Sequence, residues 1–160
     1  MLKRAAVVAS FVVIAAGLSM AGGAFGEDHG KQPWVVDIED LTVGNVHFRA
    51  TKWTGRDLQM TVMSIEPGGE IGLEKHDEGD QFIRVEKGKA RVVMGASRDE
   101  MTFDRRVSDD WAILIPAGLW HNIINEGDEP LKVYVIYAPP EHPAGTVHRT
   151  REESEAAHGH

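Results

Sequence analysis

The sequence predicts an all-β sandwich or barrel, on three observations. Short segments rich in β-branched and aromatic residues recur through the middle of the 160-residue chain. Turn-forming clusters of glycine, proline, asparagine and aspartate separate these segments about every ten residues, a spacing typical of all-β domains. No stretch between residues 41 and 140 keeps the apolar period of a helix over three turns. The expected strands are 43–50, 58–65, 70–76, 81–86, 90–94, 101–106, 111–115, 120–125 and 131–138.

The beginning of the chain has the pattern of a secretory signal peptide. Lys3 and Arg4 precede an apolar run over residues 5–18, and small residues then permit cleavage between Gly26 and Glu27. The same run is long enough to stay as a membrane anchor facing the periplasm, because no charged residue occurs between Arg4 and Glu27. We therefore expect a periplasmic or secreted protein. Its parts are the signal peptide (1–26), a lead-in (27–40), the β-barrel (41–140) and a polar C-terminal tail (141–160).

Charge and cysteine content exclude several kinds of partner and chemistry. The chain has 17 basic and 25 acidic side chains, and loss of the first 26 residues would remove two basic ones, leaving a net charge of −10. Such a surface repels nucleic acid and anionic lipid, so small molecules or metal ions are the expected partners. The sequence has no cysteine, which rules out disulfides, thiolate ligands and thiol nucleophiles.

The stretch Gly68–Gly88 places three side chains with donor atoms close together. If Glu74 and His76 lie on one strand, they share a face, because side chains alternate along a strand. A turn over residues 77–80 would bring Gln81 back beside them on a returning strand. One hairpin would then supply three of the four donors that a bound metal ion usually takes.

A second stretch, from Asp110 to Asn125, adds one more imidazole. Pro116 and Gly118 predict a sharp bend between two strands, and His121 follows on the returning strand. Taken alone, a histidine beside a turn is more often an ordinary hydrogen-bonded residue than a ligand.

Together the two stretches resemble the two motifs of the cupin superfamily. The first, G-x5-E-x-H-x4-Q-x6-G from Gly68 to Gly88, keeps every spacing of the family's G-x5-H-x-H-x3,4-E-x6-G. The second, D-x5-P-x-G-x2-H-x3-N from Asp110 to Asn125, departs from the family's pattern only at its opening glycine. The resemblance covers about residues 41–140 and implies an antiparallel jelly-roll β-barrel. Cupins often pair through edge strands, so it also implies a homodimer.

The resemblance implies a metal site at four positions. Glu74 and His76 stand where the family has its first two histidines, Gln81 stands where it has glutamate, and His121 is the last histidine. The set suits a divalent transition metal: Zn, Mn, Fe(II), Ni or Co. It is similar in kind to the mixed ligands of mannose-6-phosphate isomerase, and it contains the two histidines and one carboxylate of a non-haem iron oxygenase. The alternative is a cupin that has lost its metal, although both replacements are themselves able to ligate.

Two classes of function fit this sequence. The first is a metal-dependent isomerase, lyase or dioxygenase acting on a small sugar-like molecule or a hydroxy or keto acid. Glu74 would act there as ligand or general base. Tyr134 and Tyr137 face opposite sides of their strand, so one of them would enter the barrel. We assign this place to Tyr137, as proton donor or substrate clamp; the alternative is a tyrosine that only packs in the barrel. The second class is a non-catalytic module that binds or senses a small molecule or a metal.

Some residues have simpler expected roles. The core is expected to contain Phe82, Trp111, Ile113 and Ile115. Glu78 and Asp80 are expected to be solvated turn residues, and the tail with His142 and His148 is expected to fold over the mouth of the barrel, by resemblance.

Overall fold

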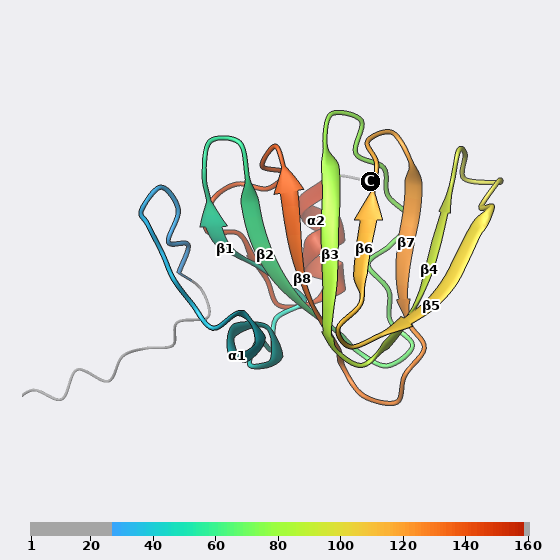
Figure 1. The fold of residues 1–160 in the computed structure, drawn as a ribbon, viewed down its shortest axis with the longest axis horizontal. Coiled ribbons are helices and arrows are strands. Elements are labelled where there is room, and N and C mark those ends of the chain that lie inside the picture. The colour runs from blue at the N-terminus through green and yellow to red at the C-terminus, as the bar shows by residue number, and fades with distance from the viewer. Residues whose placement is uncertain (1–26, 159–160) are drawn as a thin grey trace, which may run out of the picture.

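Two antiparallel sheets build the fold in the computed structural model, which describes residues 27–158 (Figure 1). One sheet has six strands in the order β6-β3-β8-β2-β1-β9, and the other has three in the order β5-β4-β7. The prediction of an antiparallel jelly-roll barrel is confirmed. The six strands are β1 (Arg49–Thr54), β2 (Gln59–Ile65), β3 (Asp80–Lys87), β6 (Ala112–Ile115), β8 (Leu131–Ala138) and β9 (Val147–His148). The three are β4 (Lys89–Gly95), β5 (Phe103–Ser108) and β7 (Trp120–Asn125).

The core lies between the sheets and follows the alternation of their strands. In the register of β3 and β8, Gln81 lies opposite Tyr137, and Ile83 opposite Val135, all four with buried side chains. Burial of these apolar faces is the main stabilising contribution, at about 25 cal/mol per Å². The inward row of each strand therefore ends in a polar residue, Gln81 or Tyr137, at the same end of the barrel. That end carries the candidate site.

Residues 43–50, expected to be a strand, are extended only at their end. Val43 is the last residue of helix α1 (Ile38–Val43), residues 44–48 form no regular structure, and β1 starts at Arg49. The Asp37 carboxylate accepts a hydrogen bond from the amide of Asp40 and caps the helix, and Gly44 ends it. Asp37, the capping residue, precedes residues 43–50, so the apolar pattern of that range alone did not indicate the helix. In Figure 1, α1 lies at the lower end of the six-stranded sheet.

Residues 70–76, also expected to be a strand, are mostly irregular. Only Glu70 and Glu74 form bridges, to Ile124 and His121 of β7. Gly72 lies between them with φ +114°, a conformation that favours glycine and interrupts the strand. The segment therefore follows β7 without forming a continuous ladder with it.

Two of the four residues assigned to the core are not in it. Ile113 and Ile115 are buried, but Trp111 is 54% exposed. It lies directly before β6, next to Asp110 with φ +71°, and its backbone carbonyl accepts a hydrogen bond from the amide of Val85 while its side chain faces outward. Phe82 is half-buried on the outer face of β3, where its ring lies 5.9 Å from that of Tyr134.

The ends of the described chain are bound to the barrel. The Asp28 carboxylate in the lead-in accepts hydrogen bonds from Thr54 and Gly145. In the tail, β9 pairs with β1, and helix α2 (Arg151–His158) is tied to β1 through a hydrogen bond from Arg49. Within residues 27–158 neither helix has the length and apolar character needed to cross a bilayer. The predicted signal peptide, residues 1–26, lies outside the described residues.

Candidate metal site

Backbone pairing places Glu74 directly opposite His121. The amide of Glu74 donates to the carbonyl of His121 at 3.0 Å, and the amide of His121 donates back to Glu74 at 2.9 Å. His121 is the second residue of β7 and its side chain is only 1% exposed, so it faces the barrel interior. Two candidate ligands that are 47 positions apart in the sequence are thus direct neighbours across this pairing.

His76 takes its position from the turn of the second motif. Its carbonyl accepts a hydrogen bond of 2.7 Å from the amide of Gly118, whose φ of +78° favours glycine. The Asp80 carboxylate accepts a further bond of 2.9 Å from the amide of Ala117. Asp80 was expected to be only a solvated turn residue, but its carboxylate also links the turns of the two motifs. Glu78 is exposed, as expected.

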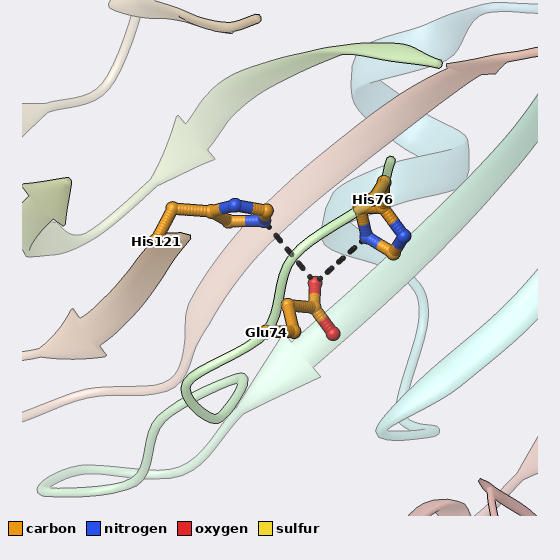
Figure 2. Close-up of side chains that lie close together, drawn as sticks. All are labelled: Glu74, His76 and His121. Carbon is orange, nitrogen blue, oxygen red and sulfur yellow. Dashed lines mark hydrogen bonds and ion pairs between the residues drawn. The ribbon is translucent and has the colours of Figure 1, made fainter. Parts of the chain in front are cut away.

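Three side chains converge on one point (Figure 2). The Nε2 atoms of His76 and His121 each lie 3.4 Å from the same Glu74 oxygen, Oε1. One donor atom from each of the three residues lies within 4.8 Å of the others. A tetrahedral ion with ligands at about 2.1 Å holds its donors about 3.4 Å apart, so the two separations from Glu74 Oε1 match those that such an ion would require.

The outer nitrogen of each imidazole is held by an oxygen acceptor. His121 Nδ1 lies 3.0 Å from the Leu119 carbonyl oxygen, and His76 Nδ1 lies 3.2 Å from a Glu141 carboxylate oxygen. Because these oxygens only accept, each Nδ1 carries a hydrogen and Nε2 is left for the centre. His121 Nε2 is buried and, apart from its 3.4 Å contact with Glu74 Oε1, makes no hydrogen bond. This second layer of contacts is typical of histidines that ligate metals.

The electrostatics of the cluster reflect its crowding. Burial by itself would raise the pKa of Glu74, but hydrogen bonds from His121 and His76 hold it well below its usual range. Burial opposes the charging of His76, yet Glu141 and Glu74 raise the pKa of His76 to about 9. A metal ion entering the site would therefore displace a proton from His76.

Gln81 and Tyr137 lie next to the three converging residues. Gln81 is buried, and neither atom of its amide makes a hydrogen bond of good geometry. Tyr137 is its cross-strand neighbour, and burial raises the pKa of its hydroxyl above the usual range. The Tyr137 ring lies edge-on to His76, with 5.6 Å between centroids. The structure thus brings together three of the four predicted ligands, Glu74, His76 and His121. It places the fourth, Gln81, beside Tyr137, whose ring contacts His76.

A cavity of about 400 Å³ opens over Glu74 and His76, and it contains residues that the sequence analysis did not single out. Arg49 reaches it from β1, and Glu141 from the tail. The tail is positioned by Gln59, whose buried amide accepts from the backbone amides of Glu141 and His142. For Glu141 the sequence offered one indication, the expected position of the tail over the barrel mouth. Arg49 belongs to no motif, so nothing in the sequence pointed to it.

The comparisons with known proteins agree with this geometry. Residues 61–137, which contain both motifs, match the family model of the cupin domain. The uncharacterized protein YrkC of Bacillus subtilis is 52% identical over 131 residues, which are 82% of this chain and 70% of that protein. The uncharacterized protein L612 of Acanthamoeba polyphaga mimivirus is 36% identical over 125 residues, 78% of this chain and 76% of that protein. The crystal structure of BH2720 from Bacillus halodurans is 55% identical with a TM-score of 0.81, covering 81% of this chain and 98% of that chain.

Proposed function

The chain belongs to the cupin superfamily, and we propose that it binds one divalent transition-metal ion at Glu74, His76 and His121. The observation that carries this proposal is the shared 3.4 Å separation of both Nε2 atoms from one carboxylate oxygen. Its support is the orientation of each imidazole by an acceptor at Nδ1. Two imidazoles and a carboxylate suit Zn, Mn, Fe(II), Ni or Co. Gln81 would contribute an amide oxygen if its side chain turned toward the ion.

We propose further that the protein is an enzyme acting on a small polar molecule in the adjoining cavity. When bound, the ion supplies Lewis-acid polarisation of a substrate hydroxyl or carbonyl. His121, on a regular strand, fixes the centre, and Glu141 keeps the ring of His76 turned toward it. Glu74 joins both imidazoles through one oxygen, which favours a role as ligand over one as general base. The Tyr137 hydroxyl is a hydrogen-bond donor beside His76.

Elemental analysis of protein purified without chelators tests the metal site. The wild type is expected to contain about one ion per chain, and a His76→Ala, His121→Ala double variant none. His47→Ala is the matched control, because His47 lies before β1 and does not line the cavity. A wild type that contains no ion, and takes up none on dialysis against Zn, Mn or Fe(II), would overturn the proposal.

Oxygen uptake then separates the kinds of chemistry. Substrate-dependent uptake by an iron-containing protein indicates a dioxygenase. Zn or Mn with turnover but no uptake indicates an isomerase or lyase. A metal-loaded protein that converts none of the hydroxy acids, keto acids and sugars offered to it is a binding or sensing module instead.

Two further proposals rest on the sequence. The pattern of residues 1–26 supports export with cleavage before Glu27, and the mass of protein recovered from the periplasm or medium checks it. The cupin fold supports a homodimer, which sedimentation of the purified protein checks.

A further inference from the structure

Arg49 is a buried cation in the wall of the cavity with no carboxylate beside it. Its side chain is the first of β1, it is 2% exposed, and it lines the same cavity as Glu74 and His76. Its Nη1 donates to the Ser154 hydroxyl at 2.9 Å, and its Nε is buried without an acceptor. Across residues 27–158 it forms no ion pair, so its closest polar partner is a neutral hydroxyl.

The other charged residues that line the cavity are either paired or exposed to solvent. Arg98 is exposed, and its guanidinium lies over the Trp120 ring. Lys75 contacts Asp77 at 2.7 Å, and Arg151 contacts Glu70 at 2.9 Å. Glu141 is occupied by His76. Glu74 attracts Arg49 from a distance, but a bound ion would take that carboxylate as its ligand. The metal-loaded cavity would then hold an excess of positive charge, carried by the ion and by Arg49.

Such an arrangement needs an anion. A buried charge is costly unless it is paired, and a guanidinium forms its strongest hydrogen bonds with planar carboxylates. A neutral sugar would leave Arg49 unpaired. A phosphate dianion would carry one more negative charge than the buried guanidinium of Arg49 can pair.

We propose that the cavity binds a small organic acid, with its carboxylate on Arg49 and a neighbouring hydroxyl or carbonyl oxygen directed toward Glu74, His76 and His121. This assignment narrows the substrate class of the proposed enzyme to small organic acids. The placement of the hydroxyl or carbonyl oxygen rests on the proposed function, because it requires the metal site. Arg49 is the residue that selects an acid over a neutral ligand of the same size. Ser154 of α2 holds the guanidinium in place, so the C-terminal helix contributes to the specificity of the site.

Calorimetric titration of the zinc-loaded protein with glycolate and glycolamide tests the assignment, because the two compounds share a skeleton and differ in charge. Glycolate is expected to bind the wild type at least tenfold more tightly. Arg49→Met should weaken glycolate binding about 10- to 100-fold, the range of a charge-assisted hydrogen bond, and change glycolamide binding little. Arg105→Met is the matched control, because it removes the same charge from an exposed position on β5. Equal affinity for the two compounds would overturn the assignment, as would an Arg49→Met protein that binds glycolate like the wild type, or phosphate that displaces glycolate at equal concentration.

Further measurements keep the test decisive. Circular dichroism shows whether Arg49→Met is folded; if it is not, Arg49→Lys replaces it, because it keeps the charge, loses the planar fork and should weaken glycolate binding partially. Metal content is measured for every variant. A wild type without metal contradicts the proposed function. The role of Arg49 can still be tested on this metal-free protein, because glycolate should bind to it and this binding should be lost in Arg49→Met. A full metal content with no preference for glycolate contradicts the organic acid alone.

Discussion

The two walls of the candidate metal site are built differently. His121 belongs to β7, which forms a continuous ladder with β4, and its side chain is 1% exposed. Glu74 and His76 belong to an irregular segment with only two bridges to β7, and their side chains are 27% and 14% exposed. The irregular wall therefore takes its position from the regular one. The loss of a ligand or of a core contact in β7 should affect both walls, whereas the loss of a contact to residues 70–76 should remain local.

The largest effect is expected for His121→Ala, which removes the ligand on the regular wall. Zinc affinity should fall more than 100-fold, because the loss of an outer contact to a ligand already costs about 10–100-fold. Competition with a chromophoric chelator measures it, with His47→Ala as control. If the variant keeps affinity within tenfold of the wild type, the regular wall does not anchor the metal.

Asn125→Ala should destabilise the whole barrel without removing a ligand. The buried Asn125 amide donates to the carbonyls of Ile65 and Glu129 and accepts from the amide of Gly127. The loss of these bonds should cost about 2–4 kcal/mol, since buried backbone groups would be left unpaired. Urea unfolding of the metal-free protein measures the free energy of unfolding. A loss below that of Asn122→Ala would contradict the dominance of β7.

Glu141→Gln tests the contact that orients His76 on the irregular wall. The glutamine can still accept from Nδ1 but carries no charge, so zinc affinity should fall about tenfold. Glu78→Gln is the control, because Glu78 is an exposed carboxylate in the nearby turn. Equal zinc affinities for the two variants in the chelator assay would show that Glu141 does not support the site.

The smallest effect is expected for Asn122→Ala. The Asn122 side chain accepts from the amide of Gly72 at 3.1 Å and donates to Glu70 at 2.7 Å, which ties the irregular segment to β7. Its removal should cost about 1 kcal/mol. Hydrogen exchange should accelerate at the Gly72 amide and stay unchanged within β7. Acceleration throughout β7 would mean that loosening the irregular segment also loosens the regular wall, which would contradict the comparison.

The sequence could predict the regular wall because local patterns specify it. The turn at Pro116 and Gly118, followed by the short segment 120–125 before the next turn, is enough to place His121 on a strand. The spacing of the two motifs also predicted that Glu74 and His76 lie next to His121. The strand predicted for residues 70–76 was wrong. A glycine at position 72 is ambiguous in a sequence, because glycine adopts positive and negative φ about equally readily, and only the structure shows that φ is +114° here.

By itself, then, the amino-acid sequence determined the all-β class, the two motifs and the residue types at the candidate metal site, because alternation and turn chemistry act over a few neighbouring residues. Only the tertiary structure decided that Trp111 lies outside the core, that Glu141 contacts His76, and that Arg49 enters the cavity without a carboxylate partner. These facts depend on contacts between segments as far apart as β1 and α2. Which charge remains unpaired is settled only when every segment is in place.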